Sequence, residues 1–124
     1  MLKGVSTVYF FVAEIRQSRD WYEKVLGTPP DEDLEEFTLF KVGGANLCLH
    51  RADAKSPVST GGAVAYWEVD DFDAAGQHFL AHGGTLHRGP INAIEDIWIC
   101  QICDPFGNVI GLEGRKPDLS HLPE

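Results

Sequence analysis

The sequence predicts an α+β fold built from two similar modules, and three observations support this. Segments that alternate apolar and polar residues predict strands, and two segments with helical spacing predict helices. The two halves of the chain also repeat the same order of elements. Because one unit of this size has a single apolar face to bury, we expect two units to pack together and their curved sheets to enclose a groove.

The first module contains a strand, a helix and a hairpin. The segment VSTVYFFV at 5–12 alternates as a strand does. Residues 15–26 recur at helical spacing, and Gly27 is placed to end the helix. Gly43 and Gly44 join EFTLFKV at 36–42 to ANLCLHR at 45–51, as in a hairpin. The proline-rich and acidic segment 28–35 predicts a loop or an irregular sheet edge.

The second module repeats this order. A strand, AVAYWEV at 63–69, precedes Asp71, which is suited to cap a helix that ends at Gly83 and Gly84. A strand near 85–88 follows, then IWICQIC at 97–103 and NVIGLEG at 108–114, joined by a DPFG turn. The segment 89–96 carries two isoleucines without an obvious core face, so we expect a loop that covers the groove.

The repeat keeps a constant register. Val12 matches Val69, and Tyr22 matches Phe79, each 57 residues apart. In the hairpins Leu49 matches Leu112, 63 residues apart. The sequence therefore predicts one domain of two tandem modules, at about 1–56 and 62–114, followed by a short C-terminal tail at 115–124.

Composition narrows the function classes. The formal net charge of −9 opposes binding to nucleic acid, whose phosphates would be repelled. No apolar run approaches the roughly 20 residues of a membrane span, and the N-terminus alternates like a strand, so we expect a cytoplasmic protein. The three cysteines are Cys48, Cys100 and Cys103. Cys100 and Cys103 lie three apart on a strand and face opposite ways, so we interpret all three as structural thiols.

Three segments carry a resemblance to a known family: VYFFVAEIRQSRDWYEKVLG, AYWEVDDFDAAGQHFLAHGG and DPFGNVIGL. In this order they cover most of residues 5–114, and the chain resembles the vicinal oxygen chelate superfamily. That superfamily includes glyoxalase I, bleomycin-resistance proteins and extradiol dioxygenases. The resemblance implies paired βαβββ modules, a cupped mixed sheet around a cleft with helices outside, and commonly a homodimer.

The metal-dependent members of the superfamily place four metal ligands in the cleft. The resemblance puts these positions on Thr7, Cys48, Val64 and Gly111. Only Cys48 is a competent ligand, whereas a divalent ion needs about three or four donors. We therefore expect neither a metal ion nor another cofactor, as in the metal-free bleomycin-resistance branch.

Two further residues stand near the ends of the closing strands. His50 and Glu113 lie two positions beyond Cys48 and Gly111, and the repeat relates them to each other. They are candidates for a displaced two-ligand site or for an acid/base pair. The alternative is that both are solvated residues at strand ends.

Strand alternation predicts the lining of the cleft. In the first strand Tyr9 faces away from the side that packs under the helix, and Tyr66 does so in the second module. The expected ligand-binding set is Thr7, Tyr9, Phe11, Cys48, His50, Val64, Tyr66, Glu68, Ile99, Gln101, Gly111 and Glu113. An apolar, aromatic surface with a few polar anchors is typical of a small-molecule site. The alternative is that these aromatic residues form a closed core.

Three functions are compatible with this pattern. The first is a metal-free protein that binds a small apolar or aromatic molecule, and could sequester a cationic compound such as an antibiotic. The second is a lyase, isomerase or dioxygenase with unorthodox metal ligands, or an acid/base enzyme that uses His50, Glu113 or Glu68. The third is a structural or partner-binding module whose tail, 115–124, reaches a neighbour.

Overall fold

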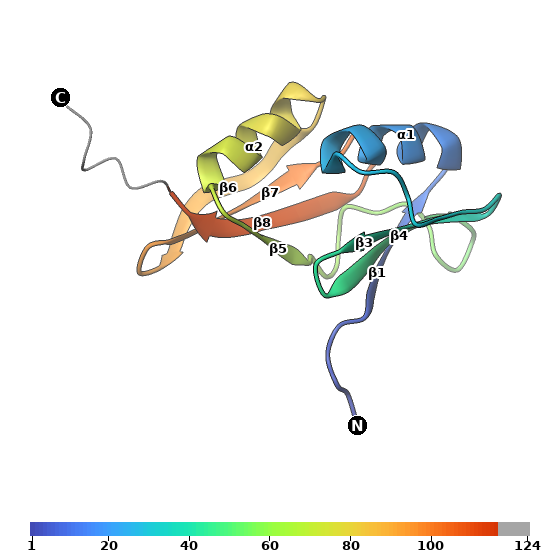
Figure 1. Ribbon diagram of the computed structural model, residues 1–124, viewed down its shortest axis with the longest axis horizontal. Coiled ribbons are helices and arrows are strands. Elements are labelled where there is room, and N and C mark those ends of the chain that lie inside the picture. Colours follow the sequence, from blue (N-terminus) through green and yellow to red (C-terminus); the bar gives the residue numbers. More distant parts are fainter. Residues whose placement is uncertain (117–124) are drawn as a thin grey trace. The chain divides into compact units, whose positions relative to one another are not determined.

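The computed structural model describes residues 1–116 (Figure 1). Within this range two helices and eight strands follow one another. They are β1 (Thr7–Val12), α1 (Ile15–Leu26), β2 (Glu32–Asp33), β3 (Phe37–Val42), β4 (Ala45–Arg51), β5 (Tyr66–Val69), α2 (Phe72–Ala81), β6 (Thr85–Ile94), β7 (Ile97–Cys103) and β8 (Val109–Arg115). The α+β fold predicted from the sequence is confirmed.

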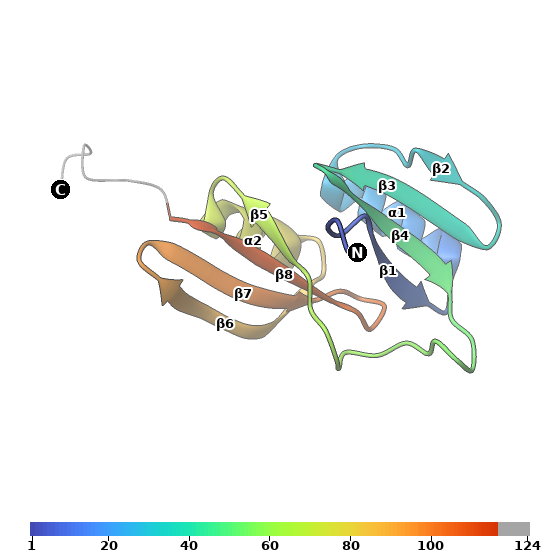
Figure 2. The same ribbon diagram turned by 90° about the horizontal axis from the view of Figure 1, so that it is seen from below.

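The strands form two four-stranded sheets with the same topology (Figure 2). The first sheet has the order β1-β4-β3-β2 and the second has the order β5-β8-β7-β6. In each sheet the first strand of the module pairs in parallel with its last strand, and the other pairs are antiparallel. The internal repeat in the sequence therefore corresponds to two copies of one βαβββ arrangement.

The chain divides into two compact units. Unit 1 comprises residues 1–62 together with Phe106–Asn108, and unit 2 comprises 63–105 and the described residues from Val109 onward. Strand β8 continues to Arg115, the first residue of the predicted tail. The remainder of that tail, from residue 117 onward, lies outside the described residues.

In unit 1, α1 covers one face of the first sheet. Phe10 and Val12 of β1 are buried on that face, and the Phe10 ring lies 6.1 Å from the ring of Tyr22 on α1. Gly27 ends the helix with a φ of 73°, and its N–H donates to the carbonyl of Glu23. A residue with a Cβ atom would be strained in this conformation, which explains why glycine marks the end of α1.

In unit 2, α2 covers the corresponding face of the second sheet. Phe72 and Phe79 of the helix are buried, together with Cys100 and Ile102 of β7 and Leu112 of β8. The side chain of Asp71 accepts a hydrogen bond from the Ala74 N–H at 3.0 Å, which caps the N-terminus of α2 as predicted.

Two sequence-based predictions in the second module are wrong. The segment 89–96 is not a covering loop, because β6 continues through it to Ile94 and pairs with β7. The pairing shifts register near Gly89 and Pro90, which are joined by a cis peptide bond. Strand β5 begins only at Tyr66, so Val64 lies before the strand.

The short edge strand β2 agrees with the irregular edge expected for 28–35. No helix within residues 1–116 is long and apolar enough to cross a membrane.

Candidate functional site

Each sheet has an open face, which we define as the face not covered by its helix. On the first sheet the strand register places Tyr9 beside Cys48 and Leu39, and Phe11 beside His50 and Phe37. Because side chains alternate along a strand, these residues share the open face. Thr7 and its neighbour Asn46 extend the same face by one more row.

Aromatic rings form the centre of this open face. The rings of Tyr9 and Phe11 lie 6.2 Å apart and nearly parallel, and the imidazole of His50 lies 5.7 Å from Phe11. Tyr9 keeps 51% of its surface exposed, so the cluster presents a ring that a ligand could stack on. The Nδ1 atom of His50 lies 2.9 Å from the carbonyl oxygen of Arg51. Since a carbonyl only accepts, Nδ1 is the donor in this contact.

Cys48 lies below these rings and is fully buried. Burial raises the pKa of its thiol to about 11, because the charged thiolate loses its hydration. A thiol that stays protonated at neutral pH is a poor metal ligand and a poor nucleophile. Cys48 therefore serves the packing of the first sheet.

On the second sheet the Tyr66 ring lies across Gly111. A Cβ atom added to Gly111 would meet Tyr66 Cδ1 at 2.6 Å and the Ala65 carbonyl oxygen at 2.8 Å. The Tyr66 hydroxyl accepts a hydrogen bond from the side-chain amide of Gln101 at 2.8 Å, which fixes the ring in this position. The glycine at position 111 is thus required by the close approach of an aromatic ring.

Two carboxylates are neighbours on the same open face. Glu68 of β5 is the register partner of Glu113 on β8, and both side chains are exposed. Ile99 pairs with Glu113 on the other side, and Ile91 pairs with Ile99. The open face of the second sheet therefore combines an aromatic ring, a pair of negative charges and an apolar edge.

The residues at the four family metal positions do not fit a metal ion. Gly111 offers no side chain and is covered by Tyr66, and the Cys48 thiol is buried and protonated. Val64 has no side-chain donor atom, and Thr7 offers only a neutral hydroxyl, which accepts a hydrogen bond from the Asn46 side-chain amide at 3.5 Å. Among residues 1–116, no group of three His, Cys, Asp or Glu side chains converges as a metal site would require.

The open faces hold eleven of the twelve residues proposed from the sequence. Thr7, Tyr9, Phe11, Cys48 and His50 lie on the first sheet. Tyr66, Glu68, Ile99, Gln101, Gly111 and Glu113 lie on the second sheet. Val64 lies outside the strands. His50 belongs to unit 1 and Glu113 to unit 2, and the pairing predicted for them stays a prediction.

Sequence reasoning missed several residues of the open faces. Phe37 and Leu39 of β3 flank His50 and Cys48, and the alternation of EFTLFKV could have identified them. Ile91 and Arg88 of β6 flank Ile99 and Gln101. They were missed because a Gly-Pro pair interrupts the alternating pattern there.

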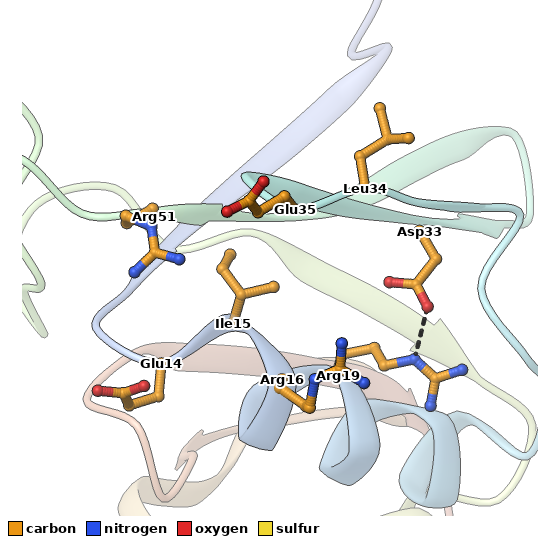
Figure 3. Close-up of a pocket in the computed structure, with 8 residues that line it drawn as sticks. All are labelled: Glu14, Ile15, Arg16, Arg19, Asp33, Leu34, Glu35 and Arg51. Carbon is orange, nitrogen blue, oxygen red and sulfur yellow. Dashed lines mark hydrogen bonds and ion pairs between the residues drawn. The ribbon is translucent and has the colours of Figure 1, made fainter.

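Unit 1 also contains a polar pocket on the helix side of the first sheet (Figure 3). Its volume is about 380 Å³. The lining residues come from the start of α1, from the region of β2 and from the end of β4: Glu14, Ile15, Arg16, Arg19, Asp33, Leu34, Glu35 and Arg51.

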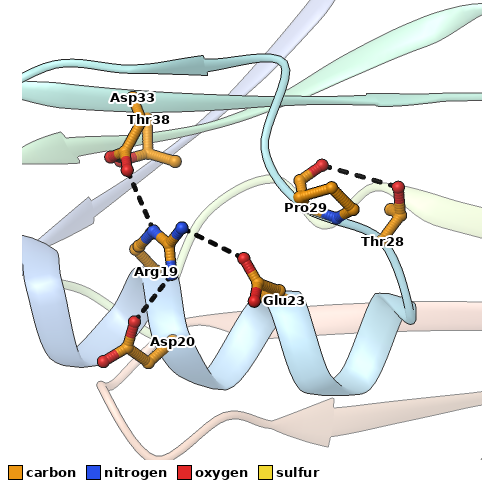
Figure 4. Close-up of polar contacts among 7 residues, drawn as sticks. All are labelled: Arg19, Asp20, Glu23, Thr28, Pro29, Asp33 and Thr38. Atoms are coloured by element: carbon orange, nitrogen blue, oxygen red, sulfur yellow. Dashed lines mark hydrogen bonds and ion pairs between the residues drawn. The ribbon is translucent and has the colours of Figure 1, made fainter.

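Two of the lining residues, Arg19 and Asp33, belong to an ion-pair network (Figure 4). Arg19 pairs with Asp33 at 3.0 Å, and also with Asp20 at 2.9 Å and Glu23 at 3.1 Å. The hydrogen bonds that the Arg19 guanidinium donates to the carboxylates of Asp20 and Asp33 raise its pKa above the usual value. Asp33 also accepts from the Thr38 hydroxyl at 3.2 Å. The network links α1 to the edge strand β2.

Comparisons with known proteins agree with this architecture. The sequence model of the Glyoxalase/Bleomycin resistance protein/Dioxygenase superfamily matches residues 4–112. A glyoxalase/bleomycin resistance protein from Albidiferax ferrireducens T118 has a similar structure, with a TM-score of 0.72 and 20% identity, over 89% of this chain and 97% of that chain. A search of the curated proteins finds no match.

Two further solved structures share the fold. A glyoxalase/bleomycin resistance protein/dioxygenase family enzyme from Burkholderia phytofirmans PsJN aligns with a TM-score of 0.74 and 20% identity, over 89% of this chain and 97% of that chain. A glyoxalase-related enzyme from Fulvimarina pelagi aligns with a TM-score of 0.73 and 17% identity, over 92% of this chain and 89% of that chain.

Proposed function

Since this chain belongs to the glyoxalase/bleomycin resistance protein/dioxygenase superfamily, we propose that it is a small-molecule-binding protein that works without a metal ion. The observation that carries the proposal is the Tyr66 ring over Gly111, where metal-dependent relatives present a ligand. An aromatic surface takes the place of a metal ligand, and such a surface favours binding of an organic molecule.

The ligand class follows from the chemistry of the open faces. Tyr9 and Phe11 provide ring faces that attract planar and cationic groups. On the second sheet, Glu68 and Glu113 place two adjacent negative charges on the same open face as Tyr66, and the net charge of −9 favours cations at long range. We therefore propose an aromatic, cationic compound, and sequestration of an antibiotic of this kind is the function we favour.

Ligand binding is tested by thermal-shift screening followed by calorimetry. Bleomycin-type and mitomycin-type antibiotics and simple cations such as acridine dyes are suitable probes. A compound that binds should raise the melting temperature of the protein. Tyr9→Ala should weaken its affinity about tenfold or more, since stacking of a planar ring on an aromatic side chain contributes about 1–3 kcal/mol. Leu80→Ala, at an exposed apolar residue of α2, is the matched control. If no such compound stabilises the protein, the ligand class is wrong.

The metal-free state is tested separately. Elemental analysis of protein purified without added metal should give no stoichiometric zinc, nickel, manganese or iron. EDTA should leave the melting temperature unchanged, because no described residue cluster would lose a bound ion. A stoichiometric metal that EDTA removes with a loss of stability would contradict the proposal.

A second candidate function rests on the Glu68–Glu113 pair. Two carboxylates on adjacent strands could divide the roles of general acid and general base in a metal-free enzyme. This function predicts that Glu113→Gln abolishes turnover of a bound compound while its affinity changes little. If the protein only binds its ligand, Glu113→Gln lowers the affinity for cations, and neither the parent nor the variant shows turnover.

We further propose that the protein is a cytoplasmic homodimer. Its three cysteines are free, as is usual in a reducing compartment. Tyr9, Tyr66, Ile91 and Ile94 leave apolar surface exposed on the open faces, which a second copy could cover. Light scattering coupled to size-exclusion chromatography should give a mass near twice that of the 13.7 kDa chain.

A further inference from the structure

The polar pocket of unit 1 lies on the opposite side of the first sheet from the open face. His50 faces the open side, and the next residue of β4, Arg51, faces α1 and lines the pocket. Figure 3 shows Ile15 directed from α1 toward the strands and the guanidinium group of Arg51 directed toward the helix. The pocket is therefore a separate site from the surface discussed above.

The charges of this pocket are only partly neutralised. Arg19 is paired with Asp33, and Arg51 is paired with Glu36 at 2.9 Å. Three other lining residues, Glu14, Arg16 and Glu35, make no ion pair or side-chain hydrogen bond with the described residues. One positive and two negative charges thus remain available around a single pocket.

We propose that this pocket binds a small dibasic zwitterion, an amino acid with a cationic side chain such as L-arginine or L-lysine. Such a molecule carries one carboxylate and two cationic groups, which complements the available charges. Its carboxylate pairs with Arg16, and its two cationic groups pair with Glu14 and Glu35. A volume of about 380 Å³ lies within the usual range of small-molecule pockets and accommodates a ligand of this size.

Apolar residues complete the match. Ile15 is buried at the base of the pocket, and Leu34 is exposed at its margin. The methylene groups of a lysine or arginine side chain can pack on both while the charged ends stay with the polar residues. A diamine would leave Arg16 unpaired, and a neutral amino acid would leave one carboxylate unpaired.

The ion pairs at the two sides of the pocket hold its walls. Arg19 connects α1 to Asp33, and Arg51 connects β4 to Glu36 just before β3. Because these arginines are already engaged, Arg16 is the lining cation left to receive a carboxylate. This assigns the specificity for the carboxylate to one residue and makes the proposal easy to test.

The test is a ligand series measured by calorimetry and by ¹H–¹⁵N NMR at low ionic strength. L-arginine and L-lysine should bind and shift the amides of residues 14–19, 33–36 and 51. Agmatine, which lacks the carboxylate of arginine, and norleucine, which lacks the side-chain cation of lysine, should each bind at least fivefold more weakly. Raising the salt concentration should weaken binding, because the contacts are exposed ion pairs.

Matched variants separate the roles of the charges. Arg16→Gln should remove the preference for L-arginine over agmatine, while Glu35→Gln should weaken both ligands. Lys24→Gln on α1 and Glu32→Gln on β2 change exposed charges outside the pocket and should leave both affinities unchanged. All four positions are exposed or lie on the surface of their elements, so the variants should fold.

Three results would overturn the proposal: no shifts at millimolar L-arginine or L-lysine, equal binding of agmatine, or equal weakening by the control variants. None of these outcomes bears on the open faces, because Tyr9 and Tyr66 are untouched. The proposed function and this second site can therefore fail independently.

Discussion

At the scale of single residues, Tyr66 and Gly111 show how one contact sets the chemistry of a strand. The ring occupies the space that a side chain at position 111 would need, and Gln101 holds the hydroxyl. The lack of a metal-ligating side chain at position 111 is therefore a consequence of how the Tyr66 ring packs. A substitution that introduces a donor side chain at position 111 would clash with the Tyr66 ring and disturb the fold.

Gly111→Ala should lower the free energy of unfolding by about 1–3 kcal/mol, because the new methyl group overlaps Tyr66 and the Ala65 carbonyl. Urea denaturation measures the loss. Gly44→Ala is the control, since a Cβ atom there meets nothing within 4 Å. Equal stability of the Gly111→Ala protein and the parent would contradict the close approach of the Tyr66 ring.

Cys48 should make stability depend on alkaline pH. Burial raises the pKa of the folded Cys48 thiol from its usual value of 9.0 to about 11, so the unfolded chain releases this proton first as the pH rises. Its contribution is fully present below pH 9 and is lost between about pH 9 and 11, by on the order of 2 kcal/mol. Denaturation at several pH values checks this, and Cys48→Ala should flatten the decline. An unchanged slope in that variant would refute it.

At the scale of elements, the two helices begin in different ways. Asp71 caps α2 through its side chain, whereas Glu14 precedes α1 without a side-chain cap. Instead, the buried Ser18 hydroxyl donates to the Glu14 carbonyl at 2.7 Å. The start of α1 thus leaves the Glu14 carboxylate available to the polar pocket.

Asp71→Ala should lower stability by about 1 kcal/mol, since the Ala74 N–H loses its acceptor. Thermal or chemical denaturation measures this loss. Asp70→Ala, at the exposed preceding position, should have an effect within about 0.5 kcal/mol. Similar losses in both variants would mean that charge, and not the cap, is responsible.

Gly76→Ala should raise stability by about 0.5–1 kcal/mol, because alanine is favoured in a helix interior. Gly76 lies within α2, and a Cβ atom at this position meets nothing within 4 Å. The same denaturation experiment measures the gain. A loss of stability would show that the small apolar pocket lined by Gly76, Phe72 and Cys100 needs its open volume.

The elements were predictable where local chemistry marks their ends. Helix α1 has the predicted bounds because Gly27 adopts a left-handed conformation, and Asp71 marks the start of α2. The length of strand β6 was underestimated, because Gly89 and Pro90 form a pair that usually indicates a loop. Here β7 continues to pair with that segment through register shifts, which only the tertiary structure reveals.

At the scale of the whole molecule, the two units are interleaved in sequence. Residues 106–108, in the turn between β7 and β8, belong to unit 1. The Phe106 ring lies 6.0 Å from Trp21, and the Asn108 side-chain amide donates to the Phe11 carbonyl at 3.0 Å. A hairpin of the second module thus supplies part of the first unit.

Cleavage of the segment between the modules should leave the fragments associated. Lys55 lies in an exposed segment between β4 and β5, so limited trypsin treatment should cut there, and Lys55→Gln should resist. The C-terminal fragment keeps Phe106 and Asn108, which pack within unit 1. Size-exclusion chromatography should therefore show the two fragments in one peak. Asn108→Ala should weaken their association. Separation of the two fragments under native conditions would disprove this.

The candidate sites differ in how far the sequence could predict them. Alternation along single strands was enough to place Tyr9 and Tyr66 on open faces. The polar pocket was missed because its charges come from α1, β4 and the region of β2, which are far apart in sequence. The burial of Cys48 likewise depends on neighbouring strands.

Each sheet packs against its own helix through a hydrophobic layer. The open face of the first sheet presents the rings of Tyr9 and Phe11, whereas that of the second presents the Tyr66 ring together with the carboxylates of Glu68 and Glu113. Because the core of each sheet lies on the opposite side, the residues of each open face can be substituted separately. Replacing the open-face residues of one sheet by those of a relative should leave the hydrophobic core of the other sheet intact. The protein is therefore a practical scaffold for chimaeras with altered ligand preference.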